Sequence, residues 1–138
     1  MEKENVVLVD IHDNKIGVME KMEAHEKGLL HRAFSVFIFN SKGEILLQKR
    51  SIEKYHSGGL WSNTCCSHPR VGEGLSNAAR RRLMEEMGMS TELFHTFSFQ
   101  YKSKLDHNMI ENELDHVFIG YSNDRPVLNK KEVESYCY

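Results

Sequence analysis

The sequence has few cysteines, no large excess of either charge and no long apolar run, and each of these features excludes some classes of protein. Three cysteines among 138 residues, two of them adjacent (Cys65 and Cys66), favour a reduced compartment over a disulfide-stapled secreted domain. A formal net charge of −2 gives no global basic field for nucleic acid or anionic lipid. No apolar run approaches the ~18 residues of a membrane span, and the start Met1–Asn5 is too polar for a secretory signal. We therefore expect a cytoplasmic protein that binds neither nucleic acid nor a membrane.

No repeat, linker or low-complexity tract divides the chain, so we expect one domain over residues 1–138, with roughly two-thirds of its unfolded surface buried. Phe34–Phe39 is apolar on both parities, which predicts a strand buried on both faces. A turn at 40–43 and a return strand at Glu44–Lys49 follow it. The other segments expected to be strands or extended are Asn5–Val9, Ile16–Met22, Trp61–His68, Phe94–Lys102 and Met109–Tyr121.

One helix is clear from its pattern. It is predicted over Asn77–Met87, with Ser76 as N-cap and Gly88 as the C-terminal stop. Its apolar stripe at i, i+4 and i+8 consists of Ala79, Leu83 and Met87. A second helix is predicted at Lys130–Tyr136. Strands on both sides of one strong helix favour an α+β domain with a mixed sheet.

Two carboxylates occur at strand spacing in the segment MIENELDHVF. Glu111 and Glu113 share one face, and the opposite parity carries apolar side chains. Such a pair can hold a metal or transfer protons, or it can simply be the solvated face of a sheet. Cys66 and His68 likewise share a parity. They could be an activated nucleophile and base, two zinc ligands, or an inert buried thiol beside a capping histidine.

Further candidate groups are dispersed along the chain. His25 and His31 precede the buried strand, and with His68 and the two glutamates they would form a ligand set suited to Mn, Zn or Fe and tolerant of Mg. Glu86 borders the buried face of the predicted helix, where it could reach a site or merely pair with Arg82. Diphosphate recognition requires basic groups, and the candidates are Lys21, Arg50, Lys54 and Arg82.

Together these segments resemble the type 1 isopentenyl-diphosphate isomerases of the Nudix superfamily. The matching segments are MEKMEAH (19–25), LHRAF (30–34), WSNTCCSHP (61–69), RRRLMEEMG (80–88) and IENEL (110–114). The resemblance implies a Nudix-type mixed β-sheet sandwich with flanking helices, and the isomerisation of isopentenyl diphosphate to dimethylallyl diphosphate in isoprenoid biosynthesis. Family members continue beyond the position matched by Tyr136–Tyr138, and carry there a tryptophan thought to face a carbocation.

The resemblance also implies roles for individual residues. Cys66 and Glu113 would be the two catalytic groups, with Tyr101 beside Glu113 on the proton-donor side and Cys66, as thiolate, the base. A divalent metal (Mn, Mg or Zn) would be held by His25, His31, His68, Glu111 and Glu113. Mg²⁺ on the diphosphate would be held by Glu86, and the diphosphate itself would be bound by Lys21, Arg50, Lys54 and Arg82. No oligomeric state follows from the sequence.

Two alternatives remain open. One is a Nudix hydrolase acting on a nucleoside or prenyl diphosphate, and the other is an inactive domain that binds metal or diphosphate. Aligned on Gly88, the chain keeps much of the hydrolase pattern, namely Glu73, Arg81, Leu83, Glu85, Glu86, Gly88 and Met89. It has Arg82 where hydrolases carry a further glutamate. Because diphosphate hydrolysis uses several carboxylates around Mg²⁺, this arginine favours binding without cleavage.

Overall fold

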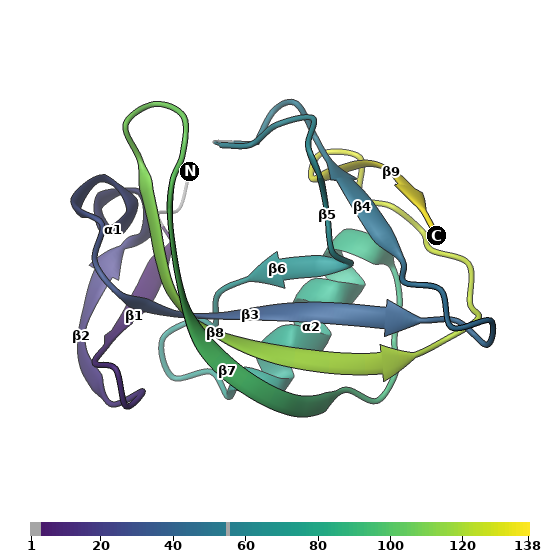
Figure 1. The fold of residues 1–138 in the computed structure, drawn as a ribbon, viewed down its shortest axis with the longest axis horizontal. Coiled ribbons are helices and arrows are strands. Elements are labelled where there is room, and N and C mark those ends of the chain that lie inside the picture. Colours follow the sequence, from purple (N-terminus) through teal and green to yellow (C-terminus); the bar gives the residue numbers. More distant parts are fainter. Residues whose placement is uncertain (1–3, 55) are drawn as a thin grey trace.

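The computed structural model describes residues 4–54 and 56–138, so the polar start Met1–Lys3 lies outside the described residues. Two helices and nine strands form from these residues (Figure 1). In chain order they are β1 Asn5–Val9, β2 Lys15–Glu20, α1 Lys21–Lys27, β3 His31–Phe39, β4 Leu47–Arg50, β5 Trp61–Ser62, β6 Cys65–Ser67, α2 Leu75–Met87, β7 Phe94–Lys104, β8 Ile110–Tyr121 and β9 Val133–Cys137. None of the helices formed by the described part of the chain is long and apolar enough to cross a membrane.

The strands form two sheets. The larger has the order β2-β1-β3-β8-β7, with β6 also paired to β3, and the smaller has the order β5-β4-β9. At the centre of the larger sheet β3 and β8 run parallel, whereas its other pairs are antiparallel. Figure 1 shows β7 and β8 curving together and extending beyond β3 as a hairpin on the side of α1. Mixed sheets with two helices in one domain confirm the α+β prediction.

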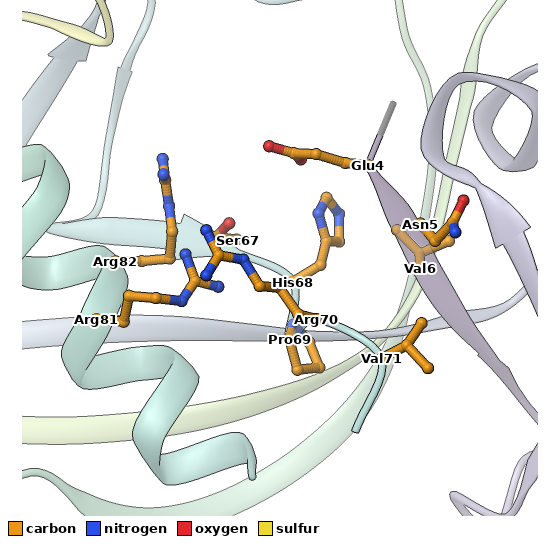
Figure 2. A pocket seen from close by; sticks show the side chains of 10 residues that line it. All are labelled: Glu4, Asn5, Val6, Ser67, His68, Pro69, Arg70, Val71, Arg81 and Arg82. Carbon is orange, nitrogen blue, oxygen red and sulfur yellow. The ribbon is translucent and has the colours of Figure 1, made fainter. Parts of the chain in front are cut away.

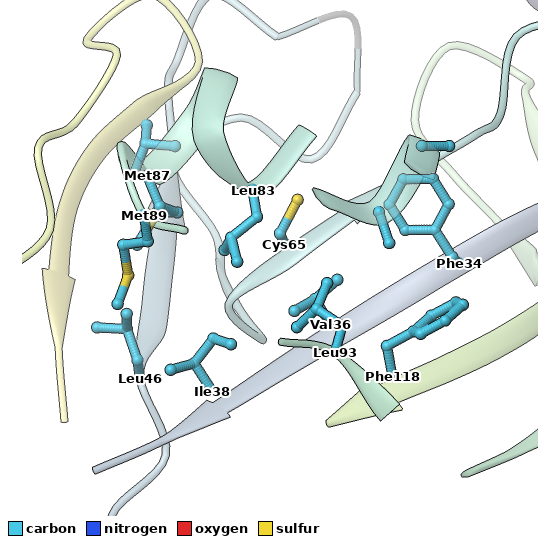
Figure 3. Close-up of a cluster of buried hydrophobic side chains, with 13 residues drawn as sticks. Phe34, Val36, Ile38, Leu46, Cys65, Leu83, Met87, Met89, Leu93 and Phe118 are labelled. Atoms are coloured by element: carbon cyan, nitrogen blue, oxygen red, sulfur yellow. The ribbon is translucent and has the colours of Figure 1, made fainter. Parts of the chain in front are cut away.

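The main hydrophobic core lies between α2 and the central strand β3. The predicted stripe Ala79, Leu83 and Met87 is fully buried, and it packs with Val36 and Ile38 of β3. Figure 3 shows Leu83 of α2 facing Val36 and Ile38 of β3, with the Cys65 sulfur among them. The core therefore fixes α2 and β6 relative to β3, and these are the elements that carry much of the candidate site.

Two local predictions were wrong, and a third was correct only in part. Helix α2 begins at Leu75 with Gly74 as its N-cap, and no side chain caps it, so Ser76 lies inside the helix. The segment 130–136 forms no helix: Val133 is buried, and β9 pairs antiparallel with β4. The predicted return strand pairs at first only through the Phe39–Ile45 bridge, and β4 itself begins at Leu47. In the last two cases tertiary pairing outweighed the local pattern.

The segment 16–22 was also only partly a strand, because α1 begins at Lys21. The Glu20 side chain accepts a hydrogen bond from the backbone N–H of Glu23 at 2.9 Å, which caps the helix. Gly28 ends it with φ 66°, a left-handed conformation that glycine adopts without strain. The Asn112 amide donates to the Gly28 carbonyl at 3.0 Å and ties the end of α1 to β8. This tether places His25, on α1, beside the central strands.

Candidate metal and diphosphate site

Strand pairing brings the predicted site residues together from distant parts of the chain. In the parallel β3–β8 pair, His31 lies opposite Glu113. On the other side of β3, the antiparallel β6 places Cys66 opposite Ser35. Because side chains alternate along a strand, Glu111, Glu113 and Asp115 share one face of β8. Histidine, thiol and carboxylate therefore meet on one face of the larger sheet.

Three imidazoles form the centre of this cluster. His25 comes from α1, His31 from β3 and His68 from just after β6, and one ring nitrogen of each lies within 4.8 Å of the others. The Glu113 Oε2 atom is 3.6 Å from His31 Nε2 and 3.3 Å from His68 Nε2. Such a grouping of imidazole and carboxylate could hold a divalent ion.

The backbone fixes which nitrogen faces the cluster. His25 Nδ1 is 2.8 Å from the Lys21 carbonyl oxygen, and His31 Nδ1 is 3.0 Å from that of Leu29. A carbonyl only accepts hydrogen bonds, so in both rings Nδ1 carries the proton and Nε2 presents a lone pair. His31 Nε2 is buried and makes no hydrogen bond within the described residues. Histidines that bind metal are oriented in the same way, so this donor set fits a metal ion.

Burial keeps the imidazoles in the form that metals bind. It lowers the pKa of His68 to about 4, and it also lowers the pKa of His25. Both rings are therefore neutral at pH 7, as a histidine ligand must be.

The two predicted carboxylates have opposite protonation behaviour. Burial, together with the negative charge of Glu113, raises the pKa of Glu111 to about 8. Burial also acts to raise the pKa of Glu113, but the neighbouring imidazoles of His31 and His68 outweigh it and hold that pKa well below its usual range. At neutral pH the pair thus carries one proton in the metal-free protein.

Cys66 is an exposed residue that lines two cavities. Its thiol is open to solvent on one side, donates to Asn63 Oδ1 at 2.8 Å and is 3.6 Å from Ser35 Oγ. Burial by the surrounding protein, with the nearby charges of Asp115 and Glu113, raises its pKa to about 12. The predicted thiolate is therefore not the form that the metal-free protein holds; it holds the thiol.

Two cavities meet at Cys66. A polar depression of about 50 Å³ contains all four predicted diphosphate-binding residues, together with two carboxylates; its lining is Glu4, Lys21, Arg50, Lys54, Cys66, Ser67, His68, Arg82 and Glu132. A second cavity of about 190 Å³ includes apolar walls; its lining is Arg50, His56, Ser57, Leu60, Trp61, Ser62, Cys66 and Glu111. The pair suits a ligand with an anionic end and a small apolar end, with the thiol between them.

A third cavity, of about 220 Å³, adjoins the polar depression and shares Glu4, Ser67, His68 and Arg82 with it. Figure 2 shows Arg81 and Arg82 reaching in from α2 on one side, and Glu4 and Asn5 on the other. Arg81 is held by Glu73 at 2.8 Å and by Glu85 at 2.7 Å, whereas Arg82 also lines the polar depression.

Two of the predicted site residues, Glu86 and Tyr101, lie apart from the other predicted residues. Glu86 is buried: it accepts a hydrogen bond from the Cys65 thiol at 2.9 Å and lies 3.4 Å from Arg82 Nη2. It is thus linked to the polar depression through Arg82. Tyr101 lies opposite Glu113 in the β7–β8 pair and remains 42% exposed.

Three residues at the site were not predicted from the sequence. His56 Nε2 is 3.8 Å from Glu111 Oε2, and burial lowers the pKa of this histidine to about 4. Asp115 shares the strand parity of Glu111 and Glu113, so that spacing could have indicated it. Glu132 contacts Arg82 and Lys54 from the segment before β9, and no local motif marks it.

Comparison with known proteins agrees with the fold. The NUDIX domain family matches residues 29–138. A solved structure from Deinococcus radiodurans (DR0079) superposes with a TM-score of 0.79 at 20% identity, over 97% of this chain and 82% of that one. The MutT protein of Methanosarcina mazei superposes with a TM-score of 0.65 at 24% identity, over 78% of this chain and 75% of that one. Fold and site thus define a NUDIX-domain protein.

Curated relatives narrow the assignment. The chain is 55% identical to Isopentenyl-diphosphate Delta-isomerase 2 of Aromatoleum aromaticum, over 97% of this chain and 71% of the relative. It is 58% identical to Isopentenyl-diphosphate Delta-isomerase of Pectobacterium atrosepticum, over 96% of this chain and 74% of the relative. The chain belongs to the isopentenyl-diphosphate Delta-isomerase family of NUDIX-domain proteins.

Proposed function

We propose that the protein isomerises isopentenyl diphosphate to dimethylallyl diphosphate by moving a proton across the allyl unit. The observation that carries this proposal is the position of Cys66, which lines both the polar depression and the partly apolar second cavity. A diphosphate held by the basic residues would place a short hydrocarbon beside this thiol and near Glu111. Family membership supports the same reaction.

The reaction needs one group that gives a proton to the terminal alkene carbon and one that removes a proton from C2 of the resulting tertiary carbocation. We assign these transfers to Glu113, with Tyr101 beside it, and to Cys66. An unactivated alkene is a weak base, so the donor must be held close and water kept away. In the metal-free protein the one proton of the Glu111–Glu113 pair resides on Glu111, so it must pass to Glu113 before Glu113 can donate to the alkene.

We assign the metal site to His25, His31, His68, Glu111 and Glu113, occupied by Mn, Mg or Zn, and we assign the diphosphate to Lys21, Arg50, Lys54 and Arg82 with Mg²⁺ and Glu86. A bound divalent ion would supply positive charge, which favours the thiolate form of Cys66, the form that removes the C2 proton. The protein residues themselves bind the diphosphate, orient the alkene between Glu113 and Cys66, and exclude water.

Isotope exchange tests the proposal. Incubation of isopentenyl diphosphate in D₂O should give deuterated dimethylallyl diphosphate, detected by mass spectrometry. Cys66→Ala should abolish label uptake and leave metal content unchanged, whereas Cys137→Ala, an exposed cysteine on β9, should behave as the wild type. Release of phosphate without label uptake would instead identify a hydrolase.

A further inference from the structure

Two carboxylates of the protein itself already lie in the polar depression. Beside its four basic side chains lie the carboxylates of Glu4 and Glu132. Both oxygens of Glu132 lie 2.7 Å from Arg82 Nη2, and Oε1 is 3.2 Å from Lys54 Nζ. Two of the four residues assigned to the diphosphate are therefore bound to the Glu132 carboxylate. Glu4 pairs with Lys21 at 2.9 Å, but its side chain is 67% exposed.

Glu132 is held firmly in this position. Its backbone N–H donates to the Asn129 carbonyl at 3.0 Å, and its own carbonyl accepts from Ser51 N–H at 3.0 Å. Burial acts to raise the pKa of Glu132, but the charges and hydrogen bonds of Arg82 and Lys54 outweigh it and lower that pKa. The carboxylate is thus ionised and anchored to the loop after β4.

The negative charge of Glu132 and the small volume left in the polar depression both oppose the binding of a free anion there. The depression measures about 50 Å³, room for only a few water molecules, while Glu132 occupies it. A diphosphate that reached Arg82 would also lie against a carboxylate of like charge, which is unfavourable in a partly buried site. Glu86, 3.4 Å from the same guanidinium nitrogen, adds to the negative charge around Arg82.

From these contacts we propose that Glu132 is a specificity-determining residue that makes the site select diphosphate in complex with a divalent cation. A free anion must displace Glu132 from Arg82 and Lys54, whereas a Mg²⁺-diphosphate complex brings a positive charge that the carboxylate can face. The inference rests on the proposed function, because it concerns the same diphosphate site.

The test measures binding of inorganic pyrophosphate by isothermal titration calorimetry, with and without Mg²⁺. We compare the wild type with Glu132→Gln, which keeps the size of the side chain and removes its charge. Glu134→Gln is the matched control, since Glu134 is 53% exposed and pairs with Lys49 at 3.7 Å. Without Mg²⁺, Glu132→Gln should bind pyrophosphate at least about tenfold more tightly than the wild type. The affinity it gains from Mg²⁺ should be correspondingly smaller, and Glu134→Gln should match the wild type.

Equal or weaker Mg²⁺-free binding by Glu132→Gln would overturn the inference, because a residue that merely positions Arg82 would weaken binding when altered. If Glu132→Gln does not fold, Glu132→Asp serves instead: its shorter side chain should loosen the contact with Arg82 and shift the Mg²⁺-free affinity in the same direction. A wild type that binds no pyrophosphate even with Mg²⁺ would refute the diphosphate site itself, and with it the proposed function.

Discussion

Replacing Asp115 with asparagine should stabilise the metal-free protein by an amount that depends on pH. Asp115 lies on β8 with 7% of its surface exposed, and Ser35 Oγ donates to its Oδ2 atom at 2.7 Å. Its Oδ1 atom is buried and has no hydrogen-bond partner within the described residues. Burial, with the charge of Glu113, raises the pKa of Asp115 to about 7 from an ordinary 3.8.

The direction of the pH effect follows from this raised pKa. A carboxyl group whose pKa rises on folding favours the folded state below its ordinary pKa, and that contribution is lost as the pH rises through the folded value. The interval from 3.8 to about 7 corresponds to at most about 4 kcal/mol once the group is ionised. Asparagine carries no charge, and its carbonyl can still accept from Ser35. The variant should gain little at pH 4 and up to about 4 kcal/mol by pH 8.

Urea denaturation in EDTA between pH 4 and pH 8 measures this difference. Asp124→Asn, at an exposed position, is the control and should show no such pH dependence. A gain for Asp115→Asn that is constant across the range, or a loss that grows with pH, would show that burial does not disfavour the Asp115 carboxylate.

Three further predictions concern the metal site, the α1 tether and the core. His25→Ala should weaken metal binding by more than about 100-fold, measured by calorimetry, and unchanged affinity would remove His25 from the ligand set. Gly28→Ala should lower the free energy of unfolding by about 1–2 kcal/mol, because φ is 66° and a Cβ atom would lie 3.2 Å from Ile110; a urea melt that does not shift would contradict this. Leu83→Ala should cost about 2–5 kcal/mol in the same assay, and a smaller loss would mean that the core beside α2 can collapse.

The sequence predicted those parts of the fold in which local pattern and tertiary packing agree. The run Phe34–Phe39 is buried as β3, and the stripe on α2 is buried as its spacing requires. Helix α1 was missed because seven residues carry little helical signal, and its end is fixed by a contact from Asn112 far along the chain. Strand β9 was missed because pairing with β4, which the local pattern does not contain, decides its conformation.

In the candidate site, too, features set by the local pattern were predicted and features set by tertiary contacts were not. The face shared by Glu111 and Glu113 follows from strand alternation alone, so it was predicted correctly. His56 and Glu132 are single residues in connecting segments, and nothing in their spacing connects them to the cluster. The pKa of Cys66 depends on burial and on carboxylates of another strand, so its protonation state could not be derived from its own segment.

The parallel register that places His31 opposite Glu113 would link binding of the proposed cation to the folding equilibrium. The two residues come from strands widely separated in sequence, so the ligand set does not exist in an unfolded chain. A cation that binds only the native state adds about 4 kcal/mol to its stability when present at ~1,000 times its dissociation constant. A cation bound at the proposed site would therefore join the two central strands, and the free energy of unfolding would increase with the metal concentration.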